Sequence, residues 1–330
     1  MMLKVSNRSF VVAVAIMTGA VAFGGASVRH ASAASGMTIG YLVKTLSNPY
    51  FVAMGDAAKA AGAKYGATVV VEAGKYDGDN SSQISQVDDF VTRQAKAIAL
   101  VPNLSSGLDT ALRRAKAAGI AIIAVDTALA PTSLATSFVA TDNLKAGVLN
   151  GRWAKAKFGS TKPVIALLEG TPGSSVNSDR MNGFLQGYGP NTKQYVVADQ
   201  IANGDQGKGQ TAMENILTAH PDVNLVWTIN EPVALGAATA IKAHGMADKI
   251  TIVSMDGSCR GIKGVRDGAI ATDVMQFPKK MATEAVQLAQ QAGDGKKIPA
   301  RVDTGETLVT AHTEAGVPSQ SVEYGLKNCW

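Results

Sequence analysis

From about residue 37 onward, the chain alternates between two patterns of apolar and polar positions. Short apolar runs rich in β-branched residues predict strands, at 38–43, 67–71, 97–101, 121–125, 164–168, 194–198, 224–229, 250–255 and 271–275. Between these runs, apolar residues recur at i, i+3, i+4 and i+7, as they do over residues 108–115. That spacing predicts amphipathic helices, so strands and helices alternate along the chain.

Strand–helix alternation of this kind builds parallel, doubly wound sheets with helices on both faces. The predicted strands are too many for one comfortable open sheet, so the pattern favours an α/β protein with two Rossmann-like lobes. A (β/α)8 barrel shows the same alternation and is the alternative fold. No Pro-rich linker or charge run separates two independent domains. We therefore expect the chain to pass between the lobes through a hinge rather than a conventional linker.

The N-terminal segment has the three parts of a secretory signal peptide. Lys4 and Arg8 lie in a short basic stretch, an apolar run covers residues 10–23, and Ala31-Ser32-Ala33 is a small-residue cleavage pattern. We expect cleavage after Ala33, so that residues 1–33 are the signal and the mature protein is exported. An uncleaved membrane anchor is the alternative, because the apolar run approaches the length of about 20 residues that spans a bilayer.

Cleavage changes the interpretation of the charge. Removing Lys4, Arg8 and Arg29 lowers the formal net charge from +5 to +2, so the basic composition gives no case for nucleic-acid binding. The two cysteines, Cys259 and Cys329, both remain in the mature chain. In an oxidising compartment we expect a disulfide between them, with two free thiols as the alternative.

Polar side chains follow several predicted strands at the point where each strand ends. In open α/β sheets, ligands bind in the crevice beyond these carboxyl ends. The residues there are Ser47-Asn48-Pro49-Tyr50-Phe51, Asn103, Asp126, Asn230, Asp256 and Gln276. Planar Asp, Asn and Gln groups each bond two neighbouring hydroxyls, and an aromatic face covers the C–H face of a sugar ring. The set is therefore typical of a sugar pocket.

Each of these residues also has a purely structural explanation. Asn48 can cap a helix with Pro49 in its first turn, and Asp126 and Asp256 can be turn residues. Tyr50 and Phe51 can belong to a helix core. The set favours a binding site because all its members lie on the same edge of the predicted sheets.

Longer motifs resemble the ribose-binding group of periplasmic binding proteins of sugar ABC importers, over about residues 37–305. The resemblance rests on the segments Leu42–Phe51, Ala219–Val223, Ala234–Ala237, Asp256-Gly257, Gln276–Pro278 and Arg180–Phe184. It implies two lobes joined by a three-stranded hinge, the type I periplasmic binding protein fold. It also implies sugar contacts by Asn48, Tyr50, Phe51, Asp126, Arg180, Asn230, Asp256 and Gln276.

By the same resemblance, the chain crosses between lobes near residues 140–141, just after Gln276, and near Thr304. The N-terminal lobe is then 34–140 plus 277–305, and the C-terminal lobe is 141–276 plus 306–330. Residues after Ala311 extend past the usual end of the family.

The chain departs from the ribose binders at four positions near the expected site. The chain reads Val101-Pro102-Asn103 where the family has Asn-Pro, so the amide is displaced onto Asn103. Thr127 replaces an Arg, Gly204 replaces an aromatic residue and Glu231 replaces an Asp. We still expect Asn103, Thr127 and Glu231 to contact the ligand. Losing an Arg and an aromatic residue predicts a sugar, polyol or amino sugar other than ribose.

The expected protein is thus a periplasmic, monomeric solute-binding subunit without a cofactor, which presents a small sugar or polyol to a membrane permease. A same-fold receptor for a signalling molecule, in chemotaxis or quorum sensing, is the closest alternative. A glycoside-processing enzyme is a weaker one. The scattered histidines, and the absence from the sequence of Cys-x-x-Cys and Gly-x-Ser-x-Gly motifs, disfavour an enzyme. A signal peptide in place of an N-terminal helix-turn-helix argues against a DNA-binding repressor.

Overall fold

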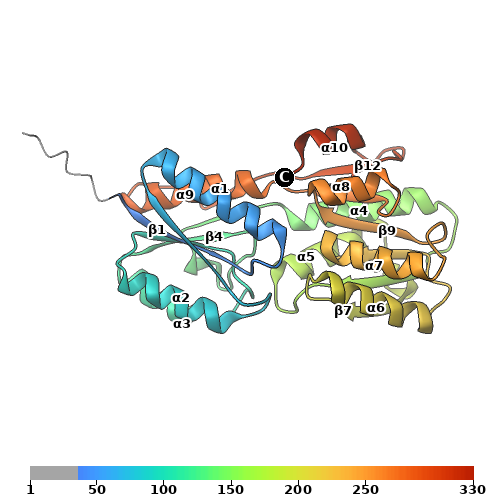
Figure 1. Cartoon of the computed structure of the whole chain (residues 1–330), viewed down its shortest axis with the longest axis horizontal. Coiled ribbons are helices and arrows are strands. Elements are labelled where there is room, and N and C mark those ends of the chain that lie inside the picture. The colour runs from blue at the N-terminus through green and yellow to red at the C-terminus, as the bar shows by residue number, and fades with distance from the viewer. Residues whose placement is uncertain (1–35) are drawn as a thin grey trace, which may run out of the picture. The chain divides into compact units, whose positions relative to one another are not determined.

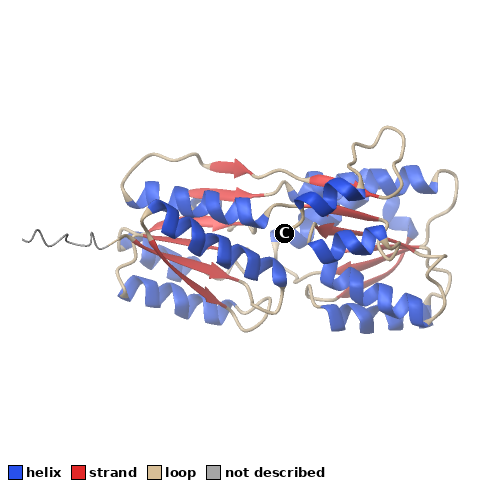
Figure 2. Cartoon of the chain, turned by 45° about the horizontal axis from the view of Figure 1, so that its top comes forward, coloured by secondary structure: helices blue, strands red, loops and turns tan. Residues whose placement is uncertain are grey.

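A computed structural model describes residues 36–330, and the predicted signal peptide lies outside them. The described chain forms two six-stranded sheets (Figures 1 and 2). The first sheet has the order β11-β5-β4-β3-β1-β2, with β1 Thr38–Val43, β2 Thr68–Ala73, β3 Ala97–Leu100, β4 Ala121–Val125, β5 Ser137–Ala140 and β11 Arg301–Asp303. The second has the order β12-β10-β9-β8-β6-β7, with β6 Ile165–Glu169, β7 Val196–Ile201, β8 Leu225–Thr228, β9 Thr251–Asp256, β10 Thr272–Met275 and β12 Thr307–Thr310.

Helices cover the two sheets, as alternation predicts. They are α1 Pro49–Tyr65, α2 Asn80–Thr92, α3 Asp109–Ala117, α4 Asn143–Phe158, α5 Ser175–Tyr188, α6 Gln206–Ala219, α7 Glu231–Ala243, α8 Cys259–Arg266, α9 Pro278–Gly293 and α10 Val322–Asn328. On the first sheet, α1 and α9 share one buried apolar cluster, and α2 and α3 share another. The second sheet has one large cluster that includes the buried Trp153 and Trp227. Within residues 36–330, no helix is both long and apolar enough to cross a bilayer.

The described residues form two open sheets and not a (β/α)8 barrel, so the prediction of a two-lobed α/β fold is confirmed and the barrel alternative is wrong. Strands pair in parallel except β12, which runs antiparallel to β10. The strand predicted at 194–198 is displaced, because a 3-10 turn occupies Thr192–Tyr195 and β7 starts at Val196. The chain passes from the first sheet to the second after β5, returns after β10, and passes again between β11 and β12.

Helices α4 and α5 pack with their backbones almost in contact. A Cβ atom built on Gly147 or Gly151 of α4 would lie 2.2 Å from a main-chain oxygen of α5, and one built on Gly183 would lie 2.2 Å from the oxygen of Leu144. No side chain larger than hydrogen fits at these positions, since real contacts of a Cβ atom are above 3 Å. The close approach brings Arg180, on α5, within reach of Asn143 at the start of α4: their Nε and Oδ1 atoms are 2.8 Å apart.

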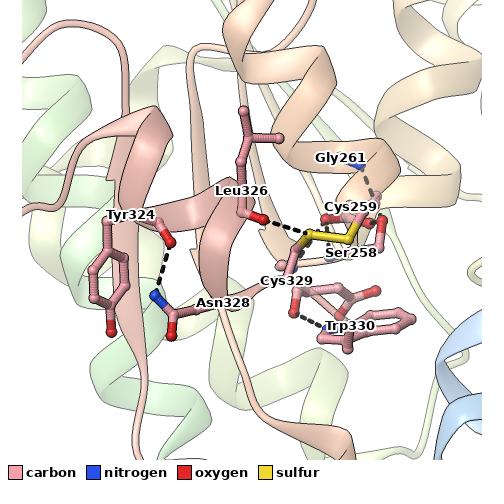
Figure 3. The surroundings of a disulfide bond; sticks show 11 residues. Ser258, Cys259, Gly261, Tyr324, Leu326, Asn328, Cys329 and Trp330 are labelled. Carbon is pink, nitrogen blue, oxygen red and sulfur yellow. Dashed lines mark hydrogen bonds between the residues drawn. A yellow bond between two sulfur atoms is a disulfide. The ribbon is translucent and has the colours of Figure 1, made fainter.

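Residues 311–330, here called the tail, return to the second sheet. Helix α10 packs against Ile262 of α8 and Val309 of β12, where Gly325 allows the approach. Cys259 and Cys329 form a disulfide that closes the tail onto the start of α8 (Figure 3).

We predict that Gly151→Ala lowers the free energy of unfolding by about 1–3 kcal/mol, because the added methyl group must push α4 away from α5. Urea denaturation followed by circular dichroism measures the effect. The control is Gly207→Ala on α6, where the nearest atom to a Cβ is an aspartate side-chain oxygen at 3.4 Å. Replacing a helical glycine there is expected to be neutral or to stabilise by up to about 1 kcal/mol. Equal destabilisation by both substitutions would contradict the packing argument.

Candidate ligand-binding site

The carboxyl ends of both sheets supply side chains to one small polar cavity. Its volume is about 40 Å³, and it is lined by Lys44, Asn48, Tyr50, Phe51, Asp77, Asp126, Gly170, Thr171, Ser174, Val176, Asn177, Arg180, Gly204, Ile229, Asn230, Asp256 and Gln276. Eight of the predicted site residues are among them. They are the eight that the family resemblance carries over.

The start of α1 positions the aromatic part of the cavity. Asn48 caps the helix by accepting a hydrogen bond from the Tyr50 N–H at 3.0 Å, and Pro49 follows in the first turn. The structural explanation of Asn48 therefore holds alongside its place in the cavity. Tyr50 is only 3% exposed, and its hydroxyl lies 3.1 Å from Asp126 Oδ1 and 3.0 Å from Gln276 Oε1. Its single proton is donated to one of these two oxygens.

Arg180 brings a buried positive charge from α5. Its guanidinium donates to the carbonyl of Ile229 at 2.8 Å and lies 3.4 Å from Asp256 Oδ1, in an ion pair whose side chains are 3% and 4% exposed. The Gln276 amide donates to the same Asp256 oxygen at 2.7 Å. Such a pair offsets the cost of burying each charge, and its remaining donors and acceptors can bond ligand hydroxyls.

Both strand-end aspartates have a positive φ angle. Asp126 has φ +62° and Asp256 has φ +143°, conformations that residues other than glycine rarely adopt. Asp126 follows β4 directly, and Asp256 is the last residue of β9. The turn of the backbone at these points directs each carboxyl group along the sheet edge into the cavity. Strained backbone of this kind is concentrated at functional sites.

Burial controls protonation in the cavity. It raises the pKa of Asp256 to about 7, although the Arg180 charge opposes the rise. Burial and the nearby Asp126 carboxylate raise the pKa of Tyr50 well above its ordinary value, so its hydroxyl stays a proton donor. The cavity thus combines fixed donors and acceptors, as a polyhydroxylated ligand requires.

Three predicted ligand contacts lie outside this cavity. Asn103 is fully buried, with its amide donating to the Asp79 carbonyl and accepting from the Gly78 N–H, so it fixes the loop after β2. The hydroxyl of Thr127 turns back to Asp126 at 3.2 Å. Glu231 lines only the neighbouring, wider cleft. In each case the side chain bonds its own protein rather than facing the cavity.

Glu231 is one of two buried acids behind the site. It accepts hydrogen bonds from the N–H groups of Gly257 and Ser258 at 2.9 and 2.7 Å, and also bonds the Ser258 hydroxyl. Asp273 lies close by, is fully buried, and has no hydrogen-bond partner for its carboxyl oxygens within the described residues. Burial raises the pKa of both Glu231 and Asp273, and the Asp273 charge raises that of Glu231 further.

The cavity also contains residues that the strand-end search omitted. Lys44 directly follows β1 and lies 3.9 Å from Asp77, and its ammonium is 6.0 Å from the centre of the Phe51 ring. Thr171 comes shortly after the end of β6, and Asn177 stands on the first turn of α5. Asn177 accepts from the Gly170 N–H at 2.7 Å. The strand-end rule predicts Lys44 and Thr171, whereas Asn177 is placed by its helix.

A wider cleft of about 1010 Å³ adjoins the cavity and shares Asn48, Asp77, Gly204 and Asp256 with it. Its walls come from α1, the starts of α6, α7 and α8, and Trp330 of the tail. Gly204 has φ +68°, and a Cβ atom there would lie 3.0 Å from Asn230 Nδ2. No group of three or more His, Cys, Asp and Glu side chains within residues 36–330 is arranged to hold a metal ion.

Comparison with known proteins gives this architecture a family. A model of the periplasmic binding protein domain matches residues 39–297. The chain belongs to this family. It is 33% identical to the ribose import binding protein of Salmonella typhimurium over 274 residues, which is 82% of this chain and 90% of that protein.

Solved structures agree with the assignment. The chain is similar to a periplasmic solute-binding protein of Actinobacillus succinogenes with bound D-allose, with a TM-score of 0.75, 28% identity and coverage of 83% and 97% of the two chains. A Bacillus halodurans solute-binding protein with bound myo-inositol gives a TM-score of 0.78, 25% identity and coverage of 89% and 99%. The ribose-binding-like family assignment is thereby confirmed, and members of this family bind solutes rather than catalyse reactions.

We predict that the Glu231–Asp273 pair makes stability fall as pH rises. A carboxyl group whose pKa is raised by folding keeps a proton that the unfolded chain has lost above pH 4.5, so the free energy of unfolding decreases until the folded pKa is passed. Asp273→Asn, which removes the unpartnered buried charge, should raise the free energy of unfolding by about 1–3 kcal/mol at pH 8 and flatten its decline from pH 5 to 8.

Urea midpoints measured across this pH range give the comparison. The control is Asp248→Asn at an exposed position, which should follow the wild-type curve. Parallel curves for Asp273→Asn and wild type would show that the buried pair does not set the pH dependence.

Proposed function

We propose that this protein is the solute-binding subunit of an ABC importer. It captures a monosaccharide, a related polyol or an amino sugar between its lobes and presents it to a membrane permease. The supporting observation is the convergence of buried, hydrogen-bonded Asp126, Arg180, Asp256 and Gln276 on one cavity fed by both sheets. The ligand contacts are the eight cavity residues named from the resemblance, with Lys44 and Asn177 added.

The lobes of the proposal are residues 34–140 plus 277–305 and residues 141–276 plus 306–330. The three passages of the chain between the sheets support these bounds. In this proposal the mature protein begins after cleavage at Ala33 and acts as a monomer. The family's name supports a location in the periplasm.

Closure of the lobes traps the ligand. Along one lip of the cavity, the two sheets' loops already bond each other: the Thr171 hydroxyl donates to Asp77 at 2.9 Å, and the Ser175 N–H donates to the Ser105 hydroxyl at 3.0 Å. A cavity of 40 Å³ holds only a few water molecules, at about 10–15 Å³ each on this measure, and is too small for a sugar ring. Entry therefore requires these contacts to open, and a ligand favours the state in which it touches both lobes.

Among the departures from ribose binders, only Gly204 lines the cavity. Gly204 also lines the wider cleft, so its missing side chain leaves space where the cavity adjoins that cleft, which supports a ligand larger than ribose. Thr127 and Glu231 face away from the cavity and carry no information on ligand size.

A thermal-shift panel tests the function, with D-ribose, D-allose, D-arabinose, D-glucosamine, myo-inositol and glycerol as candidate ligands. A ligand at 100 times its Kd stabilises the protein by about 2.7 kcal/mol, which raises Tm by several degrees. A panel without any shift would overturn the proposal of sugar or polyol binding. D-ribose as the tightest ligand in calorimetry would overturn the narrower proposal of a ligand other than ribose.

We predict that Asp126→Asn weakens binding of the best panel ligand by about 10- to 100-fold, because it removes a charged acceptor and keeps the side-chain shape. Isothermal calorimetry gives the Kd. The matched control is Asp56→Asn, an acid that lines the wider cleft but not the cavity. A larger loss for Asp56→Asn would place the ligand in the wider cleft instead.

A further inference from the structure

Trp330 is held at the edge of the candidate site by three attachments to the second sheet's side of the molecule. Its neighbour Cys329 forms the disulfide with Cys259 at the start of α8. The main-chain oxygen of Trp330 accepts a hydrogen bond from the Cys259 N–H at 3.3 Å. Its indole N–H donates to the Asp256 carbonyl at 3.0 Å. Figure 3 shows the indole beside the disulfide. The tail that carries it lies beyond residue 297, where the family match ends.

The indole ring reaches across to the first sheet's side. It packs on the Tyr50 ring in a T-shaped arrangement, with ring centres 5.4 Å apart and planes at 74°, and it contacts the apolar cluster shared by α1 and α9. Edge-to-face aromatic pairs of this geometry are favourable beyond the area that they bury. An aromatic side chain anchored by a disulfide on one side of the cleft thus contacts the other side.

Both residues that the indole touches line the polar cavity, which Trp330 itself does not. Tyr50 points its hydroxyl at Asp126 and Gln276 from the opposite end of the ring. Asp256 has the unusual φ of +143°, and the indole N–H holds the carbonyl of that same residue. One side chain outside the cavity thus contacts two residues that line it.

We propose that Trp330 is a positioning residue of the ligand site, and that the Cys259–Cys329 disulfide holds it in place. This inference rests on the proposed sugar-binding function. The competing explanation is that the disulfide only fastens the tail to α8 and that Trp330 fills surface space. The two explanations differ in what happens to ligand affinity when the indole or the disulfide is removed.

The test compares four proteins with D-allose and myo-inositol as probes, together with any other panel sugar that shifts wild-type Tm. Trp330→Ala removes both contacts, Trp330→Phe keeps the ring and removes the N–H, and the pair Cys259→Ser with Cys329→Ser frees the tail. Leu326→Ala, on the exposed face of α10, is the control in the same tail. Circular dichroism and the ligand-free Tm establish that each variant is folded.

We expect Trp330→Ala to raise Kd about 3- to 10-fold, as the loss of one aromatic contact predicts, mainly through faster release of the sugar. Trp330→Phe should show a smaller rise, and Leu326→Ala none. The cysteine pair should raise Kd in the same direction, and adding Trp330→Ala to it should raise Kd by less than the product of the separate effects. If Trp330→Ala is not folded, Trp330→Phe and the cysteine pair provide the test.

Tryptophan fluorescence supplies a readout that a purely structural role would not move. The chain has three tryptophans, of which Trp153 and Trp227 are 1% and 0% exposed, whereas Trp330 is only partly buried. Sugar binding should change the fluorescence of wild-type protein and leave that of Trp330→Phe nearly unchanged. In ligand-free protein, reduction by a phosphine should increase acrylamide quenching of Trp330.

The outcomes separate the two levels of the inference. Wild-type protein that binds none of the panel sugars would overturn the proposed function and this proposal with it. Wild-type binding with an unchanged Kd in both Trp330→Ala and the cysteine pair would overturn the positioning role alone. Fluorescence changes that persist in Trp330→Phe would likewise assign the signal, and the contact with the ligand site, to another part of the molecule.

Discussion

The buried ion pair between Arg180 and Asp256 is the interaction around which the site is assembled. It joins α5 to the end of β9 with almost no exposure to water, where an unpaired charge would cost several kcal/mol. Both charged groups are also hydrogen-bonded. The guanidinium donates to Asn143 and to the Ile229 carbonyl, and the Gln276 amide donates to the carboxylate. Gln276 in turn bonds Tyr50, which extends the network to the other sheet. A ligand enters a set of groups that are already oriented.

Acidic groups outnumber basic ones around this pair, and burial raises their pKa values. Asp256 on β9, Glu231 at the start of α7 and Asp273 on β10 are all buried, and for each of them burial is the leading cause of a raised pKa. Lys44 and Arg180 supply the opposing charge from the two sides of the cavity. Of the acids, Asp126 and Asp256 line the cavity, where their carboxyl groups can accept hydrogen bonds from ligand hydroxyls, whereas Glu231 and Asp273 lie outside it.

Much of the fold could be predicted because strands and helices repeat apolar residues at different spacings. Seven of the eight predicted cavity residues could be found because parallel strands end at one edge, and the eighth, Arg180 on α5, came from the family resemblance. The rule also selected Asn103, whose amide instead satisfies the backbone of the loop after β2. Lys44 directly follows β1 and Thr171 comes shortly after β6, so the same rule predicts both, but it does not predict Asn177, which stands on α5. The position of Trp330 at the site could not be predicted, because only the disulfide and the packing of α10 place it there, and neither follows from the local sequence pattern. The displaced β7 is an edge strand whose alternating residues mark its limits weakly.

The glycine contact between α4 and α5 has a consequence for how this site can change. Arg180 stands on a helix whose distance from its neighbour is set by main-chain atoms, without an intervening layer of side chains that could be resized. Substitutions in that interface cannot move the guanidinium by small steps. New ligand preferences must therefore arise elsewhere, on the α1 side of the cavity, where the adjoining wider cleft leaves space. The position of Arg180 is thus fixed by the helix contact, whereas substitutions on the α1 side of the cavity can change ligand specificity.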